Sequence, residues 1–245
     1  RWRIGAVSYL NTRPLLLGIE QESFLKSIDL VKSYPANIAQ DLLSGKIDIG
    51  LVPVAILPQL SDPHIVSNYV IGANGAVASV ALFSEVPIDE IKSIYLDYQS
   101  RTSVQLLKIL LSQFWKKEVE FISATEGYIA QISGTTAGVI IGDRALENLS
   151  KYPYVYDLGL AWKQLTGLPF VFAAWVANQP IPSAFMAAFD AANGHGLAHL
   201  DEVIGFIPAQ EQLYDLNKYY TENINYVYDE EMKKGLAAFL NFIKS

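Results

Sequence analysis

Cysteine is absent from this chain of 245 residues, which excludes disulfide bonds, thiolate metal sites and cysteine nucleophiles. Histidine is scarce as well. Of its three copies only His195 and His199 share a helical spacing, and no HExxH pattern accompanies them, so a solvated helix end is favoured over a metal site. The sequence also lacks an uncharged apolar run of about 18 residues, so we expect no membrane-spanning segment. No secretory signal is visible in it.

Positive charge is in short supply. The chain has 18 lysine and arginine residues against 25 aspartate and glutamate residues, which gives a net charge of -7. A nucleic-acid-binding surface needs clustered basic residues, and here they are scattered, so we expect no nucleic-acid partner. Apolar residues make up 51% of the chain, enough for the core of one large domain or of two small lobes.

The first fifty residues alternate between apolar strand patterns and helical patterns. Strands are predicted at 3–7, 28–33 and 46–52, and helices at 14–21 and 38–45. This alternation is typical of a parallel α/β sheet. We therefore predict an α/β fold.

Two long apolar strands, predicted at 76–83 and 169–177, stand on either side of a second α/β series. They predict a two-lobed protein in which 84–180 form an inserted lobe, and 1–83 with 181–245 form the other. Two mixed sheets would then be joined by two crossing strands, with a ligand cleft between the lobes. A single doubly wound sheet is the alternative.

The last third of the chain favours helices. We predict them at 183–200, 209–219 and 229–243. Asp229 and Glu230 suit the positive start of the last one.

A polar stretch, 8–15, follows the first strand and leads into a helix at Pro14. Its small hydrogen-bonding residues lie where the unpaired N–H groups of a helix start would attract an anion. An ordinary helix cap, supplied by Asn11 or Thr12, is the simpler interpretation.

A second polar stretch, 97–103, lies between a strand at 93–96 and a helix predicted at 102–115. Three hydroxyl groups and an arginine at a helix start suit a carboxylate or phosphate, although serine and threonine also cap helices without any ligand. The residues concerned are Ser100, Arg101, Thr102 and Ser103.

Two more positions lie at strand ends. Ser79 places a hydroxyl inside an apolar strand, so it needs a partner, either the backbone or a ligand. Gly142 ends a strand and Asp143 begins a helix, where Asp143 is an N-cap or, less simply, a catalytic base. The sequence contains no phosphate loop, no GxGxxG motif and no GxSxG elbow.

Six short stretches, taken together and in this order, resemble the chorismate dehydratase family of the futalosine route to menaquinone. They cover 7–15, 45–53, 79–84, 100–103, 141–143 and 166–172. The family has the two-lobed fold of type 2 periplasmic binding proteins, in agreement with the cleft predicted above.

The resemblance implies loss of water from chorismate, a small dicarboxylate, to give 3-[(1-carboxyvinyl)oxy]benzoate in the cytoplasm, without a metal or an organic cofactor. Because the reaction makes the ring aromatic, the protein mainly needs to orient the substrate and bind its anionic groups. Closure of the lobes around the ligand is expected, since water must be excluded.

The resemblance also implies roles for particular residues. Asn11 and Ser79 are expected near the reacting hydroxyl and ring, and the substrate's own enolpyruvyl carboxylate is expected to take the proton. Other residues are expected to bind substrate: Ser8, Tyr9, Arg13, Ser100, Arg101, Thr102, Ser103, Gly142 and Asp143. A non-catalytic solute-binding protein for a small carboxylate is the competing hypothesis, because one fold supports both functions.

Overall fold

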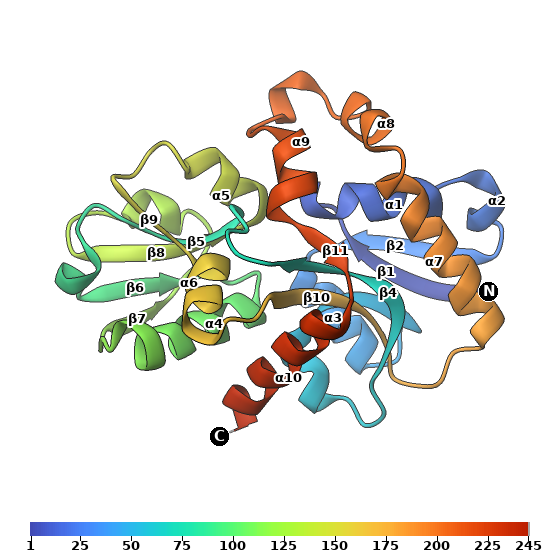
Figure 1. Ribbon diagram of the computed structural model, residues 1–245, viewed down its shortest axis with the longest axis horizontal. Helices are drawn as coiled ribbons and strands as arrows, with labels where there is room; N and C mark the ends of the chain where they lie inside the picture. Colours follow the sequence, from blue (N-terminus) through green and yellow to red (C-terminus); the bar gives the residue numbers. More distant parts are fainter. Residues whose placement is uncertain (245) are drawn as a thin grey trace.

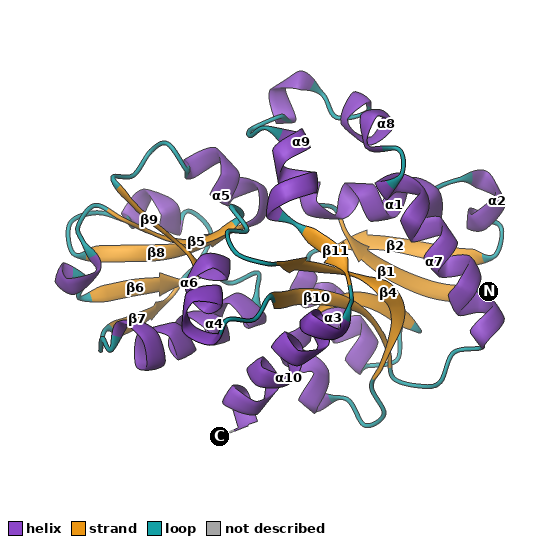
Figure 2. Ribbon diagram, in the orientation of Figure 1, coloured by secondary structure: helices purple, strands orange, loops and turns teal. Residues whose placement is uncertain are grey.

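Each of the two lobes is built on its own β-sheet (Figure 1), as the computed structural model shows for residues 1–244. The six-stranded sheet has the order β11-β4-β10-β3-β1-β2, and the five-stranded sheet the order β7-β6-β8-β5-β9. Both sheets are mixed, and helices cover their faces (Figure 2). The predicted two-lobed α/β fold is confirmed.

The large lobe contains both ends of the described chain. In it, β1 pairs in parallel with β2 and β3, while β10 runs antiparallel between β3 and β4. Its strands are β1 (Trp2–Val7), β2 (Ile28–Ser33), β3 (Ile49–Pro53), β4 (His64–Ala73), β10 (Phe170–Ala177) and β11 (Asn225–Val227). Its helices are α1 (Arg13–Ile19), α2 (Glu22–Leu25), α3 (Pro35–Leu43), α7 (Ser183–Leu197), α8 (Leu200–Gly205), α9 (Leu216–Lys218) and α10 (Glu230–Lys244).

The small lobe is the green and yellow part of Figure 1. In it, β6 is parallel to β7 and β8, and β5 is antiparallel to β8 and β9. Its elements are β5 (Val80–Ser84), β6 (Ser93–Leu96), α4 (Arg101–Leu110), β7 (Glu120–Ser123), β8 (Thr136–Ile141), α5 (Gly142–Asn148), β9 (Tyr154–Asp157) and α6 (Leu158–Thr166).

The chain crosses between the lobes at 74–79 and again at 167–169. This differs from the expected division at 83/84 and 180/181, because β5 pairs within the small-lobe sheet and β10 within the large-lobe sheet. Both strands are apolar and buried along their length, so their sequence pattern does not reveal which sheet they join. Glycines with positive φ lie at both true crossings, Gly75 at 124° and Gly167 at 74°.

Asp157 fastens the first crossing to the small lobe. Its carboxylate accepts hydrogen bonds from the backbone N–H groups of Val77 at 3.0 Å and Ala78 at 2.8 Å. It also caps α6 by accepting from the N–H of Leu160 at 3.0 Å. A single, partly buried carboxylate therefore ties the crossing to the start of a helix.

The predicted helix at 209–219 is wrong. A 3₁₀ turn at 209–211 is followed by α9, by a wider turn at 219–223 and by the unpredicted strand β11. Tyr219 and Tyr220 are buried, and their hydroxyl groups bind residues far away in the sequence. These tertiary contacts outweigh the local helical pattern.

Helices α1 and α7 pack unusually closely, through glycines. A Cβ on Gly196 would lie 1.7 Å from the carbonyl oxygen of Pro14, and one on Gly18 would lie 2.0 Å from that of Ala192. A side chain at either position would force the helices apart.

We predict that Gly196→Ala lowers the free energy of unfolding by about 3 kcal/mol or more, because the added methyl group meets rigid backbone. Gly205→Ala is the matched control, since a Cβ added there would have no atom within 4 Å and the residue too lies in a helix. Urea unfolding of both variants tests this. Equal midpoints for the two would contradict the close packing described here.

Candidate functional site

A cavity of about 60 Å³ lies where the two lobes meet. Loop and strand residues of the large lobe, the first crossing and the helix starts of the small lobe all contribute to its wall. Its polar lining side chains are those of Tyr9, Asn11, Thr12, Ser79, Ser100 and Ser103. Apolar residues, among them Leu51, Ile71 and Phe172, form much of the remainder.

None of the described residues that line this cavity carries a charged side chain. Instead, the starts of two helices border it: Pro35 opens α3, and Ser100 and Ser103 lie at the start of α4. Both helix starts carry the positive end of a helix dipole, and the start of α4 also has unpaired N–H groups, whereas Pro35 of α3 has no N–H. The cavity therefore suits an anion held by hydrogen bonds rather than by an ion pair.

The loop after β1 is held by residues from distant parts of the chain. The Leu10 N–H donates to Asp143 Oδ1 at 3.0 Å, across the lobes. The hydroxyl groups of Tyr220 and Tyr226 donate to the carbonyl oxygens of Leu10 at 2.7 Å and Asn11 at 2.6 Å. The loop backbone thus has its buried polar groups satisfied from three separate segments.

Asn11 faces the cavity and does not cap the helix. The Thr12 hydroxyl donates to Asn11 Oδ1 at 2.9 Å, and neither residue makes a side-chain capping bond at the start of α1. Thr12 therefore occupies the N-cap position of α1 without a side-chain capping bond, and the interpretation of Asn11 as a cap is wrong. With its oxygen occupied, Asn11 has its amide N–H groups left to offer a ligand.

Ser79 is almost completely buried, with 1% of its surface exposed, and it lines the cavity from the first crossing. The Tyr219 hydroxyl donates to Ser79 Oγ at 2.6 Å. The Ser79 carbonyl oxygen accepts from the N–H of Gly142 at 2.7 Å. The partner of the buried serine hydroxyl is thus a tyrosine rather than the backbone.

Within the 100–103 stretch, only one face of α4 meets the cavity. Ser100 caps the helix by accepting from the Ser103 N–H at 3.2 Å, and its hydroxyl lies 3.0 Å from that of Ser103. Both serines line the cavity, because residues three apart share a helix face. Thr102 is turned away and accepts from the Ala55 N–H at 3.1 Å, which links the two lobes. Arg101 is exposed and outside the cavity lining.

Two expected substrate-binding residues in the first stretch also lie outside the cavity lining. Ser8 is exposed, while Tyr9, its neighbour, lines the cavity. Arg13 Nη2 lies 3.9 Å from Glu211 Oε2. Successive side chains point in different directions at a strand end and around a helix turn, so the neighbours of a cavity-lining residue can lie outside the cavity. A linear motif does not reveal which neighbours do so.

Gly142 and Asp143 contribute in different ways. Gly142 lines the cavity with φ 65°, and a Cβ there would lie 3.4 Å from the ring of Tyr9. Asp143 is not the N-cap of α5, which is Ile141, and is not among the lining residues. It connects the lobes through Leu10, and burial raises the pKa of its carboxyl group above the usual range.

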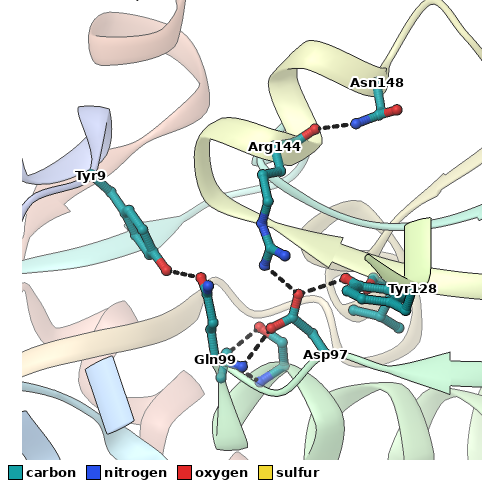
Figure 3. Close-up of polar contacts among 9 residues, drawn as sticks. Tyr9, Asp97, Gln99, Tyr128, Arg144 and Asn148 are labelled. Atoms are coloured by element: carbon teal, nitrogen blue, oxygen red, sulfur yellow. Dashed lines mark hydrogen bonds and ion pairs between the residues drawn. The ribbon is translucent and has the colours of Figure 1, made fainter. Parts of the chain in front are cut away.

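A largely buried network, which the sequence did not predict, lies behind the cavity (Figure 3). Asp97 accepts from Tyr128 Oη at 2.7 Å and from Arg144 Nη2 at 2.7 Å, and it also accepts from the Gln99 N–H at 2.6 Å. The Gln99 side chain in turn accepts from the hydroxyl of Tyr9, across the lobes. The position of Asp97 after β6 was the available signal, but its partners lie far along the chain.

This network fixes how Tyr9 meets the small lobe. Burial raises the pKa of Tyr9, so its hydroxyl stays protonated and remains a donor to Gln99. The Asp97 carboxylate has none of its side chain exposed, and Arg144 balances its charge. Gln99 is therefore held on a rigid support.

Residues 2–245 match the model of a protein family described as menaquinone biosynthesis. The chain belongs to this family. A curated relative from Thermus thermophilus, named chorismate dehydratase, is 28% identical over 265 residues, covering 96% of this chain and 93% of the relative. A second protein of that name, from Campylobacter jejuni, is 25% identical over 180 residues, covering 71% and 67%.

Solved structures place the fold among periplasmic-binding-protein-like proteins. A protein from Archaeoglobus fulgidus superposes with a TM-score of 0.71 at 12% identity, covering 99% of this chain and 96% of the other. The periplasmic aliphatic sulphonate binding protein SsuA from Escherichia coli gives 0.62 at 17% identity, covering 99% and 91%. The family resemblance and the binding-protein fold inferred from the sequence are both confirmed.

Long apolar helices and clusters of metal-binding side chains are both missing from the described part of the chain. No helix in residues 1–244 has the length and apolar character needed to cross a membrane. Within the same residues, no group of three or more His, Asp or Glu side chains could hold a metal ion.

The raised pKa of Asp143 predicts that the difference in free energy of unfolding between the wild type and Asp143→Asn depends on pH. The folded state binds the Asp143 proton more tightly than the unfolded state, so this contribution to stability is full below the unfolded pKa of about 3.9 and is lost as pH rises through the folded pKa. Asparagine keeps an oxygen for Leu10 but does not ionise. The free energy of unfolding of Asp143→Asn should therefore gain on that of the wild type as pH rises.

Urea unfolding of both proteins at several pH values from about 3.5 to 7 measures this difference. Asp201→Asn, on exposed residue Asp201 of α8, controls for the removal of one negative charge. If the free energy of unfolding of the wild type instead rises relative to that of Asp143→Asn as pH rises over this interval, the raised pKa is contradicted.

Proposed function

We propose that this protein is a chorismate dehydratase, which removes water from chorismate to give 3-[(1-carboxyvinyl)oxy]benzoate. The observation that carries the proposal is the 28% identity to a chorismate dehydratase over 96% of this chain, within a family of menaquinone biosynthesis. We further place the reaction in the futalosine route and in the cytoplasm, following the resemblance of the sequence stretches.

The cavity suits this substrate chemically. Chorismate has two carboxylates, a ring hydroxyl and an apolar ring edge. The start of α4, with the Ser103 hydroxyl, supplies donors for a carboxylate. Leu51, Ile71 and Phe172 offer an apolar wall for the ring.

The reaction is an elimination that makes the ring aromatic. A proton leaves the ring carbon that bears the enolpyruvyl ether, and the C–H electrons form a ring double bond as the C–O bond to the hydroxyl breaks. The departing oxygen takes up a proton and leaves as water. Because aromatisation drives the reaction, holding the groups in a reactive geometry supplies much of the catalysis.

Among the described lining residues there is no Asp, Glu, His or Lys to serve as general base. We therefore assign that role to the substrate's own enolpyruvyl carboxylate, which then delivers the proton to the departing oxygen. The Asn11 amide and the Ser79 hydroxyl, both on the cavity wall, would hold the reacting groups in place.

A non-catalytic solute-binding protein is the second candidate. The observation in its favour is the fold, which the chain shares with the sulphonate binding protein SsuA from Escherichia coli. Mixing purified protein with chorismate and following the ultraviolet spectrum separates the two functions. Growth of an aromatic benzoate spectrum supports the dehydratase, whereas binding of chorismate without spectral change supports the solute-binding protein.

We predict that Asn11→Ala and Ser79→Ala each lower kcat by about 100-fold or more, because each removes a donor at the reacting groups. Chorismate binding, measured by calorimetry, should change much less, since the helix starts remain. Asn217→Ala and Ser112→Ala are matched controls on exposed residues outside the cavity lining. Near-normal turnover in both site variants would overturn the assignment.

A further inference from the structure

Tyr219 lies behind Ser79 and is out of contact with solvent. Tyr219 is 0% exposed, Ser79 is 1% exposed, and their oxygens are 2.6 Å apart. Tyr219 comes from the turn after α9, which is 140 residues from Ser79 in the sequence.

The direction of this hydrogen bond follows from the acidity of the two groups. A phenol is a stronger acid than an alcohol, so Tyr219 donates and Ser79 accepts. Burial raises the pKa of Tyr219, so it keeps its proton. With its oxygen accepting from Tyr219, Ser79 has its own hydrogen free for an acceptor in the cavity.

Most other hydroxyl groups on the cavity wall already donate within the protein. Tyr9 donates to Gln99, Thr12 donates to Asn11, and Ser100 donates to Ser103. Among the described lining residues, Ser79 and Ser103 therefore have hydroxyl hydrogens left for a ligand. Ser103 lies at the start of α4, which suits a carboxylate, whereas Ser79 lies on the crossing between the lobes.

We infer that Tyr219 is a positioning residue, which fixes Ser79 as a hydrogen-bond donor to the departing hydroxyl of the substrate. This inference rests on the proposed dehydratase function. As the C–O bond breaks, its electron pair goes to the departing oxygen, and the donor from Ser79 stabilises the developing charge. Tyr219 stabilises the charge that spreads onto Ser79 Oγ. Both residues keep their protons, and the proton from the ring carbon completes the water.

We predict that Tyr219→Phe lowers kcat by about 10-fold to 100-fold and leaves the dissociation constant for chorismate within about 3-fold, because the donor strengthens only as charge develops. Tyr214→Phe is the matched control. It removes a hydroxyl from the same segment, but one that donates to Asn223 at 2.9 Å rather than to Ser79. Thermal melts establish that both variants are folded.

A double-mutant cycle separates positioning from a general structural role. In a Ser79→Ala background, Tyr219→Phe should lower kcat by less than about 3-fold, since the group it acts through is gone. A structural role would give the same loss in both backgrounds, and that result would overturn the inference. If the wild type converts chorismate and Tyr219→Phe converts it at the same rate, this inference alone is overturned. An inactive wild type would overturn the proposed function and the inference with it.

A second measurement does not depend on the folding of Tyr219→Phe. A single 3-fluorotyrosine placed at position 219 keeps the hydroxyl and gives one ¹⁹F resonance. Addition of the benzoate product should shift this resonance in the otherwise wild-type protein, and the shift should be lost in Ser79→Ala. If the product shifts the ¹⁹F resonance equally in the presence and absence of the Ser79 hydroxyl, the shift does not pass through the contact between Tyr219 and Ser79. That result would contradict the inference.

Discussion

The buried backbone of the loop after β1 imposes the constraint on which the rest of the site depends. The backbone groups of Leu10 and Asn11 are partly or fully shielded from water, so they need partners inside the protein. Asp143 supplies one from the small lobe, and Tyr220 and Tyr226 supply two more from the end of the chain. The same few contacts therefore shape the cavity and hold the lobes together, and the irregular tyrosine-rich segment replaces a regular helix.

This arrangement gives a cavity whose chemistry suits anions, although its described lining carries no charged side chain. The buried Asp97 and the half-buried Arg144, behind the cavity, pair with each other, while the lining residues offer hydroxyls, an amide and helix starts. Such a site suits the orientation of a dicarboxylate, but none of its described lining residues is an Asp, Glu, His or Lys that could act as general base. In the proposed mechanism the protein therefore orients the substrate, and the substrate's own carboxylate acts as the base.

The sequence predicted the α/β alternation and the two lobes, because apolar periodicity and turn residues carry that information locally. It also led to Asn11, Ser79 and Gly142, which line the cavity. It failed where the answer depends on direction or on distant partners. The face of α4 separates Ser103 from Arg101, and the partners of Asp97 come from residues that only the folded chain brings together. Strand pairing, which the sequence pattern does not reveal, likewise places both crossings between the lobes at residues other than those predicted.

The most direct test of the substrate carboxylate as the base compares chorismate with its analogue in which the enolpyruvyl carboxylate is an amide. An amide can still accept and donate hydrogen bonds, but it is a far weaker base than a carboxylate. The account predicts that the analogue competes with chorismate for the protein and gives no aromatic product, while chorismate is converted under the same conditions. Conversion of the amide at a rate close to that of chorismate would contradict it.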